Sequence, residues 1–162
     1  HRKLGQHAEE HDPVLIAKGY EDQPIRLSKC CNAIPGDEIV GYITQGRGIT
    51  VHRVDCKNLR NKRDFPDERK VEVEWGMPGE TKYAVDIQIE ATDRTGILYD
   101  ITGVLSGEDI DMPLLNARLN RDRSSCIMTI KMQVSGLVQL NGILAKIGKI
   151  DGVNSVYRHN VM

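Results

Sequence analysis

Three cysteines and one histidine in the first half of the chain have the residue types of a zinc site. We call them the Cys–His cluster: Cys30, Cys31, His52 and Cys56. Three thiolates and one imidazole form a tetrahedral ligand set, and His52 precedes Cys56 by one helical turn where a strand is expected to run into a helix. Adjacent cysteines on a regular strand point to opposite faces, so both bind one ion only if the backbone turns at residues 32–33. The residues alone leave three interpretations open: a metal site, small buried thiols packed around His52, or a redox site.

A group of basic residues overlaps the end of this segment. We call it the cation cluster, and its members are Arg47, Arg53, Lys57, Arg60, Lys62 and Arg63, with His52 beside them. The window 47–63 holds only one acidic residue, Asp55, whereas the whole chain has 22 basic and 23 acidic residues. Such a local excess of positive charge can bind several phosphates, with an affinity that falls as salt rises. Aromatic residues make up only 4% of the chain, which favours recognition of folded RNA by shape and phosphates over base stacking. The alternative is a solvated charged face.

A short turn in the second half of the chain could bind an amino acid. Backbone N–H groups at the start of a helix favour an anion such as a carboxylate, and a glycine lets a ligand approach closely. An ammonium group would find acceptors on Asp93 or Asn116, and two apolar side chains would line the pocket. The candidate residues are Asp93, Arg94, Thr95, Gly96, Ile97, Leu98 and Asn116. The alternative is that Asp93 and Thr95 cap the helix and that Gly96 only relieves crowding.

No pattern in the sequence indicates an active site. We find no GxSxG motif, Walker loop or HExxH motif, and the acidic pairs at residues 37–38 and 67–68 lie in polar, turn-like stretches. The fragment is therefore not expected to be an enzyme. Cys126 alternates onto the apolar face of a predicted strand and is interpreted as structural.

Composition narrows the class of protein. Hydrophobic residues make up 40% and charged residues 28%, with a mean hydropathy of −0.40 and no long apolar run, which argues against a membrane span. Four cysteines without a secretory leader favour reduced thiols and a cytoplasmic location. Because the first residue is His1 rather than Met, we expect a fragment of a longer polypeptide.

The elements that must position these residues divide at a polar linker. Residues 1–13 are interpreted as a tail or the end of a preceding element. Residues 14–75 predict a small β-rich domain of four or five short strands, with a hairpin around Gln45–Gly48. One helix, capped by Asp55 and reaching towards Lys62, is expected before Phe65 and Pro66. Residues 76–82 are rich in turn formers and predict the linker.

After the linker the periodicity changes. Strict alternation over YAVDIQIEAT, residues 83–92, predicts a strand that is wet on one face. A helix follows, with the apolar stripe Ile97, Leu98, Ile101, Val104 and Leu105, closed near Gly107. Two strands are then expected at about 112–121 and 126–134, joined by a turn at 122–125. The pattern ends with a helix, whose apolar stripe runs from Leu137 to Ile147, and a strand at 153–159. This βαββαβ order predicts a ferredoxin-like α+β fold, with both helices on one face of an antiparallel sheet.

The βαββαβ unit with DRTGIL at its first strand-to-helix turn resembles the ACT domain, a regulatory module that senses amino acids. The resemblance covers residues 83–161. It implies that the unit could bind a small amino acid at the turn described above and could pair with a second copy as a homodimer.

The preceding segment resembles the region ahead of the ACT domain in long RelA/SpoT-type (p)ppGpp synthetases and hydrolases. The matching pieces are the Cys30–Cys31 pair, PGDEIVG at 35–41, QGRG at 45–48 and HRVDC at 52–56. This region is known as a zinc-finger, CC or ribosome-intersubunit domain, so the resemblance implies zinc as a cofactor for residues 14–75. It also implies docking on large-subunit ribosomal RNA, and catalytic domains that lie N-terminal to the fragment.

Three functional hypotheses follow. The first is a regulatory module of the stringent response that binds ribosomal RNA and relays ribosome status to its own catalytic domains. The second is a sensor of a branched-chain or other small amino acid that acts allosterically. The third is a regulatory subunit of an amino-acid biosynthetic enzyme, which leaves the segment from the cysteine pair to HRVDC unexplained.

Overall fold

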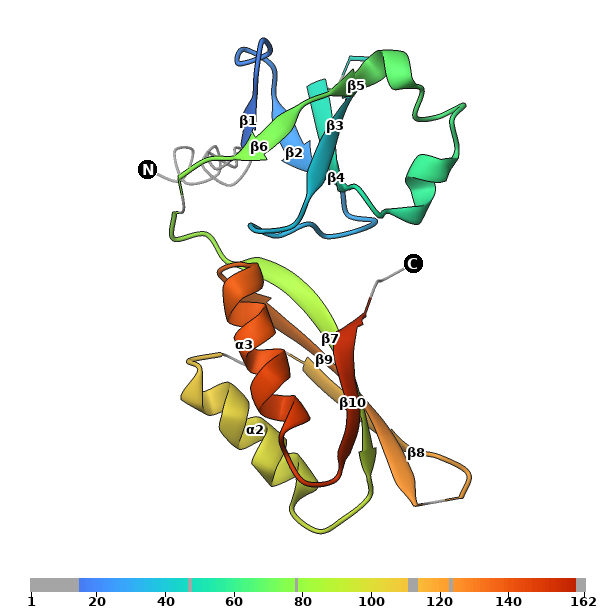
Figure 1. The fold of residues 1–162 in the computed structure, drawn as a ribbon, viewed down its shortest axis with the longest axis vertical. Coiled ribbons are helices and arrows are strands. Elements are labelled where there is room, and N and C mark those ends of the chain that lie inside the picture. Colours follow the sequence, from blue (N-terminus) through green and yellow to red (C-terminus); the bar gives the residue numbers. More distant parts are fainter. Residues whose placement is uncertain (1–14, 47, 78, 111–113, 123, 160–162) are drawn as a thin grey trace. The chain divides into compact units, whose positions relative to one another are not determined.

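The computed structural model describes residues 15–46, 48–77, 79–110, 114–122 and 124–159. The predicted tail at residues 1–13 therefore lies outside the described residues. The chain divides into two compact units between Glu80 and Thr81, and each is described by itself (Figure 1).

The first unit is built from short strands, as the sequence predicts. Its strands are β1 Leu15–Ala17, β2 Ile25–Leu27, β3 Ile39–Thr44, β4 Gly48–Arg53, β5 Lys70–Val71 and β6 Val73–Trp75. One sheet has the order β2-β4-β3-β5, and a second consists of β1 and β6. The expected hairpin is confirmed, because β3 and β4 pair antiparallel with Thr44 opposite Gly48. The segment VEVEW does not form one strand: β5 pairs with β3, whereas β6 pairs with β1.

Two apolar clusters hold this unit together. The first joins both sheets and comprises Leu15, Ala17, Ile49, Val51, Val71 and Val73. The second comprises Cys31, Val40, Tyr42, Cys56 and Leu59, with Phe65 packed against it. Val51 belongs to the first cluster, whereas the next residue of β4, His52, sits opposite Val40 of the second. Because side chains alternate along a strand, β4 serves both clusters and delivers His52 to the cysteines.

The helix expected after Asp55 is shorter and differently capped. It is a single 3-10 turn, η1 Lys57–Arg60, whose N-cap is Cys56 and makes no side-chain capping bond. The Asp55 carboxylate instead accepts a hydrogen bond from the Arg53 guanidinium at 2.7 Å, and this nearby cation replaces the helix start as its partner. A second 3-10 turn, η2 Asp67–Arg69, follows Pro66.

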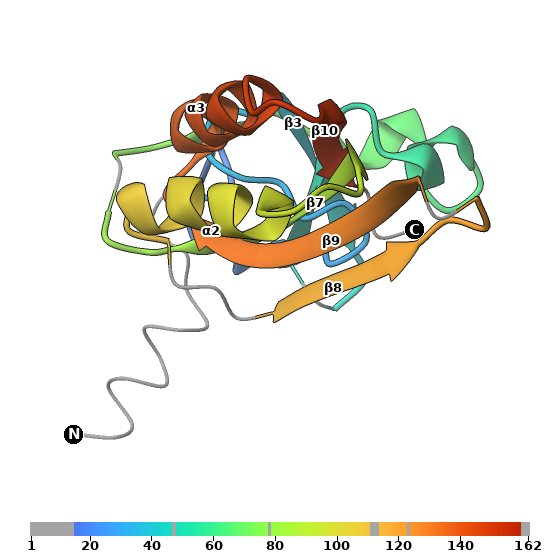
Figure 2. The same ribbon diagram turned by 90° about the horizontal axis from the view of Figure 1, so that it is seen from below.

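The second unit has the predicted ferredoxin-like fold. Its elements are β7 Tyr83–Thr92, α2 Ile97–Gly107, β8 Leu114–Leu119, β9 Ser125–Val134, α3 Leu137–Gly148 and β10 Val153–His159. The strand order is β10-β7-β9-β8 and all pairs are antiparallel. Both helices cover the same face of the sheet (Figure 2). The strand expected over 112–121 ends earlier, at Leu119, because Asn120 begins the turn by donating its backbone N–H to Ser125.

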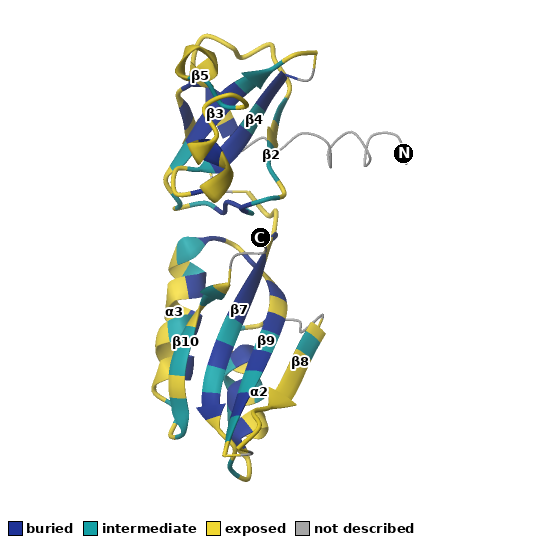
Figure 3. Cartoon of the chain, turned by 90° about the vertical axis from the view of Figure 1, so that its right-hand side faces the viewer, coloured by how far each residue is buried: buried dark blue, intermediate teal, exposed yellow. Residues whose placement is uncertain are grey.

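Burial in the second unit follows the expected periodicities, with differences on α2 and at Asp86 of β7, which is buried on the face expected to be wet. The odd-numbered residues of β7 and the even-numbered residues of β9 are buried, as the alternating blue segments of Figure 3 show. Ile97, Ile101 and Leu105 are the buried residues of α2. Leu98, which was expected on the same stripe, is 45% exposed. No helix among the described residues is long and apolar enough to cross a membrane.

Candidate metal centre and cationic surface

The ligand atoms of the Cys–His cluster converge on one point. The Cys30 sulfur lies 3.4 Å from Nδ1 of His52 and 3.5 Å from the Cys56 sulfur, and the Cys31 sulfur lies 3.8 Å from the same Nδ1. All four atoms lie within 4.8 Å of one another. A zinc ion bound by sulfur at about 2.3 Å and nitrogen at about 2.0 Å holds its ligand atoms about 3.5–3.8 Å apart at the corners of a tetrahedron. The donor set and its spacing therefore fit zinc.

The adjacent cysteines reach one centre because they do not lie on a regular strand. Cys30 and Cys31 occupy a turn after β2, and Asn32 has a left-handed φ of 47°. Asparagine tolerates this conformation better than most residues. A turn at residues 32–33 was expected to let both thiols bind one ion; in the structure the turn covers residues 29–31 and is followed by the left-handed Asn32.

Hydrogen bonds to the sulfurs tune the thiols. Burial raises the pKa of Cys30, but hydrogen bonds led by the one from Ser28 outweigh it, so that this pKa lies below its usual value. Burial raises the pKa of Cys31 to about 12 although the Arg53 backbone N–H donates to its sulfur. Burial also raises the pKa of Cys56. The metal-free cluster thus favours ionisation at Cys30.

His52 is a buried member of this centre and is not a surface cation. Its side chain is 3% exposed, and its ring makes edge contacts with Tyr42 and Phe65. Burial lowers its pKa, which favours the neutral imidazole that binds metals. The expectation that His52 contacts RNA is wrong, because its ring is enclosed and its Nδ1 faces the sulfurs.

The cation cluster is partly paired. Arg47 lies outside the described residues. The Arg53 side chain is only 15% exposed and pairs with Asp55, so it contributes little free charge. Lys57, Arg60, Lys62 and Arg63 are exposed on and after η1. Lys62 lies 3.3 Å from Asp67, an acidic residue just beyond the window 47–63.

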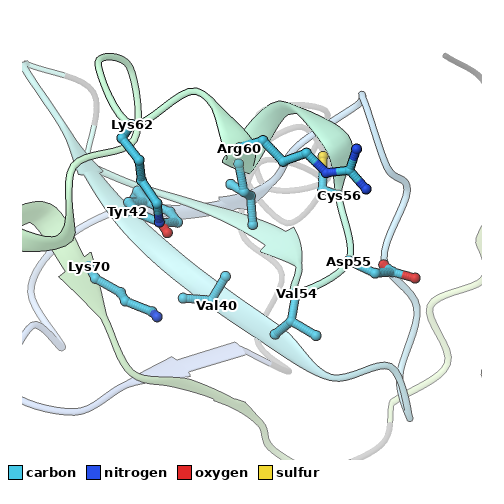
Figure 4. Close-up of a pocket in the computed structure, with 9 residues that line it drawn as sticks. Val40, Tyr42, Val54, Asp55, Cys56, Arg60, Lys62 and Lys70 are labelled. Atoms are coloured by element: carbon cyan, nitrogen blue, oxygen red, sulfur yellow. The ribbon is translucent and has the colours of Figure 1, made fainter.

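A hollow of about 430 Å³ lies beside the Cys–His cluster (Figure 4). Its lining residues are Val40, Tyr42, Val54, Asp55, Cys56, Leu59, Arg60, Lys62 and Lys70. Lys70 was not among the predicted residues, because it lies seven residues after Arg63 and outside the window 47–63. Lys70 reaches the hollow because β5 pairs with β3, which places Lys70 opposite Tyr42.

The candidate amino-acid turn is closed by one of its own residues. Arg94 donates to the backbone oxygens of Asp151 and Thr95 at 2.8 and 2.9 Å, and to the Asp100 carboxylate at 2.7 Å. Helix α2 begins after Gly96, whose φ is 84°, and no side chain caps it. The capping role considered for Asp93 and Thr95 is therefore wrong, because the N-cap position belongs to a glycine.

The other residues of this candidate site are dispersed. Ile97 is buried in the core, whereas Leu98 is largely exposed. Asn116 on β8 pairs with Thr129 of β9, which alternates with the buried Met128. Asn116 therefore lies on the sheet face opposite the helices, and the structure does not bring it to the turn. Cys126 is buried on β9.

Family comparison accounts for both units. Residues 15–76 match the RelA/SpoT RIS domain model, and residues 79–158 match an ACT domain model. The chain is a RIS–ACT region of the RelA/SpoT family. We therefore call its first unit the RIS unit and its second the ACT unit.

Relatives share this pair of domains with the chain. The GTP pyrophosphokinase of Streptomyces coelicolor is 36% identical over 91% of this chain, and that of Haemophilus influenzae is 35% identical over 91%. The chain spans only 17% and 20% of the lengths of these two relatives. Among solved structures, the ACT domain of the Chlorobium tepidum GTP pyrophosphokinase matches 49% of the chain and all of its own, with 25% identity and a TM-score of 0.44.

Proposed function

We propose that the chain is a non-catalytic regulatory part of a (p)ppGpp synthetase or hydrolase of the stringent response, and that its RIS unit binds ribosomal RNA. The family match and the relatives named GTP pyrophosphokinase support the first part. Catalytic domains elsewhere in a longer protein would receive the signal, and ribosome binding would place the protein in the cytoplasm. The match over residues 15–76 accounts for the segment that a biosynthetic regulatory subunit leaves unexplained.

The observation that carries the RNA proposal is the exposure of the cations around η1. Lys57, Arg60 and Arg63 are exposed, and no described carboxylate forms a salt bridge with any of them. Their turn is anchored because its N-cap, Cys56, belongs to the Cys–His cluster. Cations held on an anchored turn bind phosphates with less loss of conformational entropy than cations on a mobile loop.

A zinc ion bound by the Cys–His cluster would have a structural role. Cys30 and Cys31 come from the turn after β2, His52 from β4, and Cys56 from the start of η1. These residues would bind the ion through three sulfurs and Nδ1, with His52 held between Tyr42 and Phe65. Four protein ligands leave no open position for a substrate, which is typical of a site that supplies folding energy.

Binding to purified large ribosomal subunits tests the RNA proposal. We expect the double variant Lys57→Gln/Arg63→Gln to bind about tenfold more weakly at near-physiological salt, because two phosphate contacts are lost. The matched control is Arg118→Gln/Arg121→Gln, which removes two exposed arginines of the ACT unit and is expected to bind like the parent. Equal loss in both variants would indicate a non-specific charge effect and contradict the proposal.

The alternative function is amino-acid sensing by the ACT unit. The ACT match and the glycine at the start of α2 support it, whereas the bonds of Arg94 across the turn leave less room for a ligand. Calorimetry of the chain with each of the twenty amino acids tests it, and no heat with any of them would remove it. Pairing of two ACT units is a further proposal, supported by the exposed edge strand β8 and testable by analytical ultracentrifugation.

A further inference from the structure

Cationic side chains from three parts of the RIS unit line its hollow. Arg60 lies at the end of η1, Lys62 lies in the loop that follows, and Lys70 lies on β5. All three residues are exposed, and Figure 4 shows their side chains around the same depression. Three cations from separate local elements therefore concentrate positive charge at one point of the surface.

One carboxylate lines the hollow and its charge is already compensated. Asp55 accepts the hydrogen bond from Arg53 at 2.7 Å. Lys62 shares its charge with Asp67, but that pair is solvent-exposed on both sides and hence weak. The hollow thus keeps a net positive charge that suits an anion.

The floor of the hollow is mainly apolar. It contains Val40, Leu59 and the ring of Tyr42, with Val54 half exposed at the border. A compact inorganic anion does not need such a floor. A phosphate carried by a nucleotide can use it, because the sugar or base can cover the apolar atoms while the phosphate meets the cations.

We propose that this hollow binds one backbone phosphate of an RNA and the nucleotide attached to it, with Lys70 as one of the cations that meet the phosphate. The inference rests on the proposed RNA-binding function and deepens it. Compared with the residues expected from the sequence, the proposed RNA contact includes Lys70 of β5 and no longer includes His52 and Arg53. Because Cys56 belongs both to the lining and to the Cys–His cluster, the phosphate site lies directly beside the metal centre.

The test is a salt series of binding to purified large ribosomal subunits with the variant Lys70→Gln. Lys70 pairs with Tyr42 through the backbone, so the substitution leaves the strand bonds in place. Removal of one phosphate contact is expected to weaken binding about three- to tenfold and to reduce the slope of log K against log salt by about one. The control is Lys18→Gln, an exposed lysine of the same unit outside the hollow, which is expected to bind like the parent.

The outcomes separate this inference from the proposed function. If Lys57→Gln/Arg63→Gln weakens binding and Lys70→Gln does not, the hollow is not a phosphate site, although RNA binding stands. If neither variant weakens binding, both ideas fail. A parallel titration with inorganic tripolyphosphate distinguishes the source of the phosphate: a loss for Lys70→Gln with tripolyphosphate but not with ribosomal subunits would overturn the assignment to RNA. Unchanged fluorescence of Trp75 verifies that the variants are folded.

Discussion

The sulfur of Cys56 lies 3.5 Å from the sulfur of Cys30, across a separation of 26 residues. This contact joins the start of η1 to the turn after β2. Both sulfurs lie close to the Cys31 sulfur and to His52 of β4, so one ion would link three separate segments of the RIS unit. In a small unit with short strands, such a link contributes substantially to stability.

Replacing one ligand is expected to remove the metal. The chain should bind one zinc ion, and Cys56→Ser should bind none at micromolar zinc, as measured by elemental analysis after desalting. The RIS unit should also unfold about 10 °C lower, since a loss of about 2 kcal/mol shifts the Tm of a unit of this size by that amount. Cys126→Ala is the matched control, because Cys126 is buried in the ACT unit and should leave the zinc content at one. Equal zinc in all three proteins would refute the metal centre.

Zinc affinity is expected to rise with pH. The pKa of Cys31 is raised to about 12 and that of Cys56 is also raised, so both thiols are protonated in the metal-free protein at neutral pH. The lowered pKa of His52 means that its imidazole is already neutral. Binding should therefore release at least two protons, and a lower pH should oppose it. Calorimetry in buffers of different ionisation enthalpy measures the release, and a pH-independent affinity would contradict the ligand set.

Two glycines of the β3–β4 hairpin should respond differently to alanine. Both have a positive φ, 73° for Gly46 and 80° for Gly48. A Cβ at Gly48 would lie 2.2 Å from the backbone oxygen of Pro24, whereas a Cβ at Gly46 would meet nothing within 4 Å. Gly46→Ala should cost about 1 kcal/mol from backbone strain alone, and Gly48→Ala at least about 3 kcal/mol. Urea unfolding followed by the single tryptophan, Trp75, measures both, and equal costs would show that the contact with Pro24 is not rigid.

Arg94 is expected to stabilise the ACT unit. Its bond to the Asp151 backbone oxygen ties the turn before α2 to the turn before β10, and its bonds to Thr95 and Asp100 hold the start of α2. Because the side chain is 30% exposed, solvent screens the pair with Asp100, and Arg94→Ala should cost only about 1 kcal/mol. Arg118→Ala, an exposed arginine on β8, is the control and should change the free energy of unfolding by less than about 0.5 kcal/mol. Circular dichroism during urea unfolding gives both free energies. An unchanged free energy of unfolding for Arg94→Ala would mean that these hydrogen bonds do not stabilise the unit.

Local periodicity predicted what depends on neighbours in sequence. The alternation in β7 and β9 and the stripe on α3 set the ACT fold, and the glycines of the hairpin loop set the β3–β4 turn. The members of the Cys–His cluster could also be predicted, because three cysteines and one histidine form a known zinc ligand set.

Tertiary contacts decided what the sequence did not show. Asp55 pairs with Arg53 rather than capping a helix, and His52 is buried because β4 directs it to the second apolar cluster. Lys70 joins the hollow only through the β3–β5 pairing, and a strand of two residues is too short to give a recognisable sequence pattern. Arg94 fills its turn through a bond to Asp151, which lies 57 residues later.

The salt dependence of binding to large ribosomal subunits tests the central proposal most directly. For the parent chain we expect a slope of log K against log salt of about −3 or steeper, because several cations on and near η1 each displace counterions from the RNA. For Lys57→Gln/Arg63→Gln we expect a slope shallower by about two. Binding that is independent of salt, or a slope that is the same in both proteins, would contradict RNA binding by the RIS unit.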